Sequence, residues 1–331
     1  MKSYTEHSLK ALLPTDPFCK VKDDLFVACA SFESRSIATA RSLPPGYWAC
    51  QALIYVNREF LCGEPGRPTR GNMYSLVDFL ARHTGSTHVV EGSWLCAQKQ
   101  WESLRSSFDE LIPTDAVSPA ITIDVTTFNR ESLLVMTLLL RMRYPSSSIR
   151  LLYAAPQTHG EWLSRGFRIV RNVIGFAGTQ YPNRPTLLVV LSGFESERTL
   201  KLIEEHEPAL VLLGIGDPPS RVDFLNRNEA EQKLVLARQD VRPFKFAATD
   251  LLACRSSLAS LINEYGGTYN VILAPMSTKL STLAALTVAE QFPDTQITYC
   301  LPGEYNVTDY STGVGDIFLT EMPARIIQLA S

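Results

Sequence analysis

The chain has 331 residues, of which 45% are hydrophobic and 20% are charged, a composition typical of a globular protein long enough for two cores. This composition excludes a fibre, a disulfide-rich miniprotein and a disordered tail. Lys and Arg number 31 against 34 for Asp and Glu, so the formal net charge is −3. We therefore expect no general binding to nucleic acid or to an anionic membrane, and a polyanionic ligand would need a local cluster of cations.

The apolar runs and the cysteines indicate the cellular compartment of the protein. The longest apolar runs, at 133–140 and 208–215, are much shorter than the roughly 20 residues of a membrane helix, and the polar start predicts no signal peptide. The seven cysteines are odd in number and scattered, which favours thiols in a cytoplasmic protein. The five histidines do not cluster with them, so we expect no metal and no cofactor.

Strands and helices alternate along the first half of the chain. Short apolar runs predict strands at 25–30, 51–56, 87–91, 120–125 and 149–154, and the stretches between them predict helices at 36–42, 72–83, 95–111 and 130–143. The Gly- and Pro-rich segment 62–71 is expected to be a loop. Alternation of this kind predicts parallel strands, and so an α/β sheet covered by helices on both faces.

The second half of the chain repeats the first. Residues 25–34 align with 187–196, where an apolar strand runs into Phe-Glu-Ser in both copies. Further matches follow in the same order, pairing 121–127 with 271–277, 153–156 with 299–302, and 164–166 with 311–313. We interpret the chain as an α/β protein of two tandem Rossmann-like units with parallel sheets, at 1–180 and 185–331, related by a pseudo-twofold internal duplication. Generic similarity between α/β segments is the alternative.

Ligands of open parallel sheets bind beyond the carboxyl ends of the strands, where helix N-termini favour phosphates and carboxylates. The loops after the first and fourth strands of each copy lie at that edge. If the protein is an enzyme, Asp124 and Glu33 are the candidate acid and base. The candidate ligand-binding residues are Ser31, Phe32, Arg35, Thr126, Thr127, Asn129 and Arg130 in the first copy, and Gly193, Phe194, Glu195, Arg198, Met276, Ser277, Thr278 and Lys279 in the second.

The segment 270–279 has the chemistry of a phosphate site. Ser277, Thr278 and Lys279 place two hydroxyls and an ammonium at the start of a helix, after a buried strand. The glycines of a P-loop are absent, and the sequence Gly-Ile-Gly-Asp at 214–217 does not complete a dinucleotide-binding fingerprint. A P-loop NTPase and a dinucleotide-dependent dehydrogenase are therefore poorly supported.

A strand that runs into Ser-Thr-Lys and then a helix of small and apolar residues at 280–289 resembles the CRISPR-associated Rossmann fold, CARF, whose loop is typically Thr-Gly-Gly-Thr-Lys. Two such units in one chain are similar to the SAVED sensors. The resemblance implies recognition of a cyclic oligonucleotide in a groove between the units, in prokaryotic antiviral defence. Two departures stand out: Pro-Met-Ser at 275–277 replaces the family's glycines, and the first copy has no Lys at 126–130.

Three functions remain open. The first is a nucleotide-binding sensor that passes its signal to a separate effector protein. The second is an enzyme that degrades a nucleotide or phosphorylated metabolite, a metal-free phosphodiesterase or nucleotide hydrolase similar to ring nucleases. The third is a non-catalytic, protein-binding subunit of a defence complex. A homodimer is compatible with all three.

Several candidates also have a purely structural interpretation. Glu33 with Arg35, and Glu195 with Arg198, are as consistent with ion pairs or helix caps as with ligand contacts. The two phenylalanines that precede these glutamates suit core plugs better than base-stacking platforms. Asp124 is as consistent with a helix cap as with an acid or base.

Overall fold

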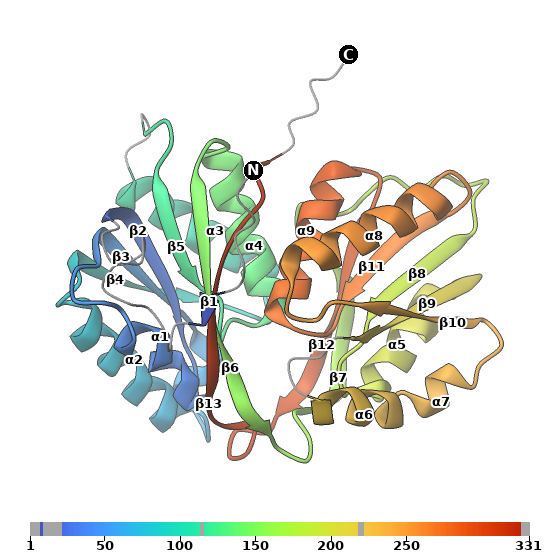
Figure 1. The fold of residues 1–331 in the computed structure, drawn as a ribbon, viewed down its shortest axis with the longest axis horizontal. Helices are drawn as coiled ribbons and strands as arrows, with labels where there is room; N and C mark the ends of the chain where they lie inside the picture. The colour runs from blue at the N-terminus through green and yellow to red at the C-terminus, as the bar shows by residue number, and fades with distance from the viewer. Residues whose placement is uncertain (1–6, 9–21, 113–115, 218–221, 326–331) are drawn as a thin grey trace. The chain divides into compact units, whose positions relative to one another are not determined.

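The computed structural model describes residues 7–8, 22–112, 116–217 and 222–325 (Figure 1). By its internal contacts the chain divides into two compact units. The first comprises residues 1–160 and 307–324, and the second comprises residues 161–306 and 325–331. Each unit is built on one β-sheet.

The sheet of the first unit has the strand order β1-β13-β6-β5-β2-β3-β4. Strands β2 to β6 are parallel to their neighbours, whereas β13 runs antiparallel to β6 and β1 antiparallel to β13. Short 3-10 helices follow β2 at Ser34–Ile37 and β3 at Arg58–Leu61. The elements are β1 (His7–Ser8), β2 (Lys22–Ala30), α1 (Ala38–Arg41), β3 (Trp48–Asn57), α2 (Gly66–Leu80), β4 (Thr84–Gly92), α3 (Ala97–Leu111), β5 (Ala120–Asp124), α4 (Arg130–Arg143), β6 (Ser148–His159) and β13 (Ser311–Glu321).

The sheet of the second unit has the strand order β10-β9-β8-β11-β12-β7. Here too the strands are parallel except for the last, because β7 runs antiparallel to β12. The elements are β7 (Ser164–Asn172), β8 (Thr186–Leu191), α5 (Ser196–His206), β9 (Leu210–Gly216), α6 (Val222–Glu231), α7 (Lys233–Leu236), β10 (Val241–Phe246), α8 (Leu251–Tyr265), β11 (Asn270–Pro275), α9 (Lys279–Gln291) and β12 (Gln296–Tyr305).

The two sheets share one topology, which confirms an α/β fold of two Rossmann-like units produced by internal duplication. In each, the first strand of the copy lies centrally, its second and third strands lie on one side, and its fourth and fifth on the other. The pseudo-twofold relation between the units stays a prediction.

The boundary between the units differs from the one predicted at 180–185. Strand β7 follows β6 in the chain but pairs with β12, and β13 follows β12 but pairs with β6. Each copy therefore supplies the antiparallel strand that covers the edge of the other copy's parallel sheet. Sequence matching located the repeats, but it could not show that the strand after each fifth strand pairs elsewhere. Without this pairing, the backbone groups along that edge would have no partner strand.

Apolar side chains on the two faces of each sheet hold the helices. In the first unit, α1 and α2 cover one face through a core that includes Ala28, Ile54 and Leu76, and α3 and α4 cover the other (Figure 1). In the second unit, α5 and α7 pack on one face through a core that includes Leu202 of α5 and Val235 of α7.

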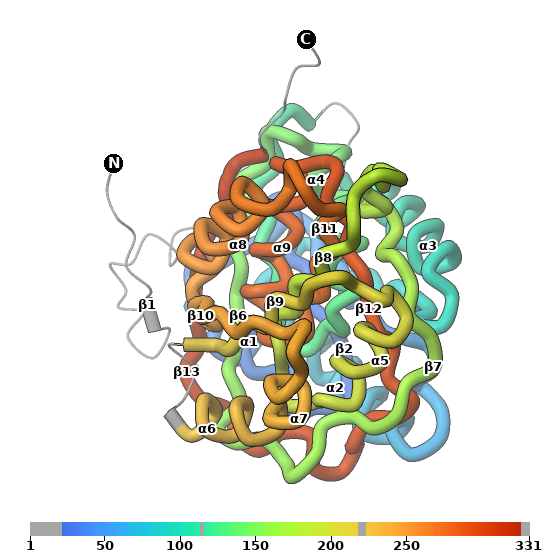
Figure 2. Tube along the Cα trace, turned by 90° about the vertical axis from the view of Figure 1, so that its right-hand side faces the viewer, coloured from blue at the N-terminus to red at the C-terminus, as the bar shows by residue number. Residues whose placement is uncertain are grey.

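The helices that follow the fourth strands are the most buried. Helix α4 is buried from residue 131 to 141 and α9 from 280 to 289, as their nearly continuous apolar sequences predict. Helices α8 and α9 lie side by side (Figure 2). Among the helices that the structure describes, none has the length and apolar character needed to cross a bilayer.

Two predicted elements differ in extent. Residues 66–71 were expected in a loop, but α2 begins at Gly66. Pro68 is compatible with this early start because it lies in the first turn, where its missing N–H breaks no intrahelical hydrogen bond. The helix predicted at 36–42 consists of a 3-10 turn followed by the single α-helical turn of α1.

At the amino ends of the strands in the first unit, a buried carboxylate joins three strands. Asp23, in β2, is only 1% exposed. Its Oδ2 accepts hydrogen bonds from the Tyr47 hydroxyl and the Thr122 hydroxyl, both at 2.6 Å, and its Oδ1 pairs with the Arg150 guanidinium of β6. The carboxylate therefore neutralises a partly buried cation and holds β2, β5 and β6 in register.

We expect Asp23→Ala to lower the free energy of unfolding by about 3 kcal/mol, because it removes the buried carboxylate that pairs with the Arg150 guanidinium and accepts two hydrogen bonds. Urea unfolding followed by circular dichroism measures this loss. Asp78→Ala, at an exposed position of α2, is the control and should change stability by less than about 0.5 kcal/mol. Equal losses in the two variants would contradict a structural role for the Asp23 cluster.

Candidate functional site

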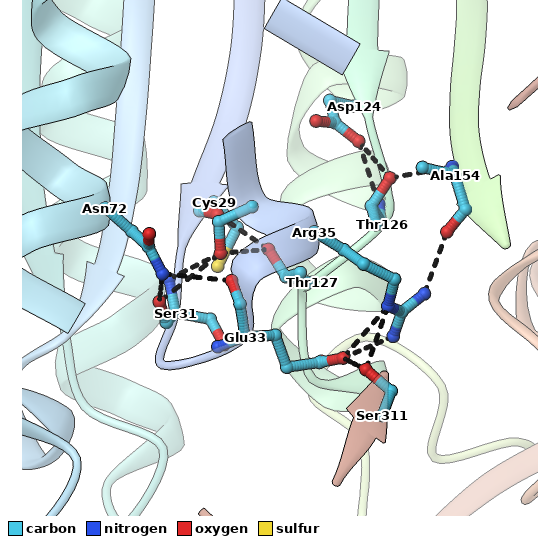
Figure 3. A network of polar contacts seen from close by, with 11 residues as sticks. Cys29, Ser31, Glu33, Arg35, Asn72, Asp124, Thr126, Thr127, Ala154 and Ser311 are labelled. Atoms are coloured by element: carbon cyan, nitrogen blue, oxygen red, sulfur yellow. Dashed lines mark hydrogen bonds and ion pairs between the residues drawn. The ribbon is translucent and has the colours of Figure 1, made fainter. Parts of the chain in front are cut away.

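In the first unit, the loop after β2 is held by a buried arginine. Arg35 is 4% exposed, donates through Nη1 to the carbonyl of Ala154 in β6 at 2.8 Å, and forms an ion pair with Glu33. The hydroxyl of Ser311, the first residue of β13, donates to the same Glu33 carboxylate at 2.7 Å (Figure 3). The loop is thereby tied to two strands.

The second unit repeats this arrangement. Arg198 is 1% exposed, donates through Nε to the carbonyl of Cys300 in β12 at 3.0 Å, and pairs with Glu195 at 3.3 Å. The hydroxyl of Ser164, the first residue of β7, donates to Glu195. We call these two sets, Glu33–Arg35–Ser311 and Glu195–Arg198–Ser164, the Glu–Arg–Ser clusters. They account for the sequence matches at 153–156 with 299–302 and at 164–166 with 311–313.

The Glu–Arg–Ser clusters contain four of the predicted site residues. Burial lowers the pKa of Arg198, but the Glu195 carboxylate and the nearby Tyr299, Tyr305 and Cys300 together raise it by more, so the guanidinium stays charged. The same two opposing effects act on the pKa of Arg35, with Glu33 as its partner. Both arginines were predicted to contact a ligand, as was Glu195, and Glu33 to act as an acid or base. All four are engaged in ion pairs and hydrogen bonds within the protein, and their roles at a ligand stay predictions.

Asp124 also lies in the interior. It is 1% exposed, and its carboxylate accepts hydrogen bonds from the backbone N–H of Thr126 at 3.0 Å, from the Thr126 hydroxyl and from the Thr39 hydroxyl. Thr126 Oγ1 in turn accepts from the N–H of Ala154 at 3.0 Å (Figure 3). Asp124 and Thr126 therefore fix the loop after β5 to β6 and α1, and the predicted catalytic role of Asp124 and ligand contact of Thr126 stay predictions.

The hydroxyls and small residues of the loops mostly bind the backbone. Thr127 Oγ1 donates to the carbonyl of Cys29 at 2.7 Å, and Ser31 is buried with its hydroxyl accepting from the N–H of Glu33 at 3.2 Å. Met276 is 1% exposed and belongs to the core of the second unit. A side chain at Gly193 would put its Cβ 2.6 Å from the carbonyl oxygen of Met276. This glycine therefore allows two loops to approach closely, and its predicted ligand contact stays a prediction.

Side-chain amides that sequence reasoning missed hold the same loops. In the first unit, Asn72 of α2 donates to the carbonyls of Ser31 at 2.8 Å and Glu33 at 3.0 Å (Figure 3). In the second, Asn228 of α6 donates to the carbonyl of Ser192 at 3.2 Å, and Gln232 donates to that of Gly193 at 2.9 Å. The sequence marks these residues only as side-chain amides in or just after the helix that follows the second strand of each copy, α2 after β3 and α6 after β9.

The two predicted aromatic residues differ in exposure. Phe32 is 8% exposed and contacts Phe60 and Tyr310 edge-on, with ring centroids 5.5 and 5.9 Å apart, so it plugs the loop core. Phe194 is half-buried, with the Arg227 guanidinium 4.3 Å from its ring centroid. It lines a small pocket of about 150 Å³ in the second unit, together with Trp162 and Arg227.

The starts of α4 and α9 match each other closely. Asn129 caps α4 by accepting from the N–H of Ser132 at 2.7 Å, and Thr278 caps α9 by accepting from the N–H of Ser281 at 3.1 Å. The first residue of α4 is Arg130 and that of α9 is Lys279. Both are half-buried, as is Ser277 beside Thr278. These positions lie where sequence reasoning placed the phosphate contacts.

The capping residues Asn129 and Thr278 make further contacts within the protein, and their ligand contacts stay predictions. The Thr278 hydroxyl also donates to the carbonyl of Ala248, and Asn129 is buried, so both side chains are engaged in starting their helices. Within the described residues, no group of three or more His, Cys, Asp or Glu side chains is placed to hold a metal ion.

Comparisons with known proteins give little guidance. No protein-family model matches the chain, and no curated protein matches it. One solved structure that matches is the N-domain with NADP of bacterial malonyl-CoA reductase, with 10% sequence identity, a TM-score of 0.22, and coverage of 81% of this chain and 78% of that chain. A similarity at this TM-score supports no conclusion about function. The fold assignment rests on the strand order of the two sheets.

Asp124 makes the stability depend on pH. Burial raises its pKa from the ordinary 3.8 to about 6, although its hydrogen bonds oppose the shift. The folded state therefore holds a proton that the unfolded state releases near pH 3.8. This proton stabilises the fold fully below the unfolded pKa, and the stabilisation is lost as the pH rises through about 6.

We expect the stability of the wild-type protein, relative to Asp124→Asn, to fall by about 2 kcal/mol between roughly pH 4.5 and pH 7.5, because the amide cannot lose a proton. Urea unfolding across this range measures the difference. Asp78→Asn, at an exposed site, is the control and should keep the wild-type pH dependence. Parallel profiles for wild type and Asp124→Asn would show that the Asp124 pKa is not raised.

Proposed function

We propose that this chain binds a small phosphorylated ligand of the nucleotide class at the carboxyl edges of its sheets. Arg130 and Lys279 would be the phosphate contacts. The observation that carries the proposal is the recurrence of a half-buried cation as the first residue of the helix after the fourth strand, in both copies.

A cation is electrostatically unfavourable at the N-terminus of a helix, where the dipole is positive, at a cost of about 0.3–1 kcal/mol. One such residue would need no explanation, but the same exception at the same place in two diverged copies favours a functional cause. The backbone N–H groups of a helix start and an adjacent cation together form a site for an anion. Phosphate is an anion that such a pairing of N–H groups and a basic side chain fits.

The rest of the edge would serve as a rigid frame. The Glu–Arg–Ser clusters and the amides of α2 and α6 fix the first-strand loops, and the Asn129 and Thr278 caps fix the helix starts. A frame held in this way lowers the entropy lost when a ligand binds.

The finer form of the proposal is a sensor of a cyclic oligonucleotide, in a cytoplasmic antiviral defence system, that acts on a separate effector protein. It is supported by the resemblance to CARF and SAVED units and by the duplicated topology. Binding without turnover is favoured over hydrolysis because the two candidate catalytic carboxylates are engaged inside the protein, Asp124 with threonines and Glu33 with Arg35.

The test is a binding titration with a panel of cyclic and linear oligonucleotides. We expect saturable binding that Arg130→Ala and Lys279→Ala each weaken by about 1–3 kcal/mol, because each removes a charge-assisted contact to phosphate. Calorimetry measures the affinity, and chromatography of the recovered ligand measures turnover.

Arg105→Ala and Lys233→Ala, at exposed positions of α3 and α7, are matched controls that should bind as the wild type does. Unchanged affinity in Arg130→Ala and Lys279→Ala would remove these residues from the site. Cleaved ligand would replace the sensor with a hydrolase, and no binding to any member of the panel would favour the protein-binding subunit.

A further inference from the structure

The outer strand β4 of the first sheet is open to pairing. It hydrogen-bonds to β3 on one side, and no strand in the described part of the chain pairs with its other side. Its nine residues, Thr84–Gly92, include no Pro, Lys or Arg. The corresponding outer strand of the second sheet, β10, contains Arg242, Pro243 and Lys245. Proline and cations are the residues with which proteins block the pairing of edge strands. The outer strand β10 is therefore protected against pairing with another strand, whereas β4 is not.

A groove also lies beside β4. A groove of about 360 Å³ runs between β4 and α3, and the α3 side of this groove is lined by Ser103, Ser106, Ser107, Glu110 and Leu111. On β4 itself, Val89 is 44% exposed. An added strand would place alternate side chains over this groove and would cover part of the exposed valine.

The charges at the two ends of β4 favour an antiparallel copy of the same strand. Exposed Arg82 and half-buried His83 precede the strand, and exposed Glu91 lies near its end. Antiparallel pairing about a twofold axis at Thr87 sets the basic end of each strand beside the acidic end of the other. Parallel pairing would instead set like charges together. A self-complementary contact of this kind is what a symmetric dimer requires.

We propose that two copies of this chain associate through antiparallel pairing of their β4 strands, which joins the first sheets of both copies into one continuous sheet. The proposal is independent of the proposed ligand, because β4 lies at the outer end of the sheet and carries neither Arg130 nor Lys279.

Sedimentation velocity over a wide range of protein concentration tests this. We expect the wild-type protein to form a dimer. In Val89→Lys the dissociation constant of this dimer should rise by roughly tenfold or more, because the new cation opposes strand pairing as the cations of β10 do. Leu234→Lys, at a position of α7 that is 75% exposed, should dimerise as the wild type does. Circular dichroism and thermal unfolding confirm that both variants are folded.

A charge exchange keeps the test decisive if Val89→Lys unfolds the protein. Glu91→Lys should weaken the dimer by placing like charges together, and the double variant Arg82→Glu with Glu91→Lys should restore it by reversing both ends. Hydrogen exchange of the β4 amides should slow as the protein concentration rises. A wild-type monomer at all concentrations, or a dimer that neither Val89→Lys nor Glu91→Lys weakens, would overturn the proposal.

Discussion

A positive charge cannot be left unpaired inside a protein, and each unit of this molecule buries one beside the carboxyl end of its last parallel strand. Arg35 and Arg198 each meet a glutamate from their own loop and a carbonyl from that strand. Removing the glutamate would leave a desolvated cation unpaired, which costs far more than a surface ion pair contributes. The first loop therefore has one favourable conformation in each copy, and the serine that starts the antiparallel strand completes it.

Because the arginines are engaged in this way, the loops after the first strand of each copy differ from the loops after the fourth strand. In the loops after β2 and β8, the arginines and glutamates form ion pairs within the protein, and Gly193 allows close packing. The loops after β5 and β11 end in capped helices whose first residues, Arg130 and Lys279, are cations. Anion recognition in our proposal thus falls on the second pair alone.

Much of the fold could be predicted because its signals are local. Alternating strands and helices, the repeated Phe-Glu-Ser turns and the buried helices after the fourth strands all come from short-range patterns of apolar residues. The site was harder to predict, because the same sequence motif serves an ion pair or a phosphate equally well. The role of Arg35 depends on Ala154 and Ser311, which lie far away in the sequence. The amides of Asn72 and Asn228 gave no periodic signal at all, and the pairing of β7 and β13 is a property of the whole topology.

The reciprocal pairing of β7 and β13 makes each copy depend on the other. The terminal strand of a single module has two ways to cover the edge of a fifth strand: it folds back onto its own sheet, or it is exchanged with the strand of a twin. The chain has the exchanged arrangement, so the edge of each sheet is covered only when both copies are present.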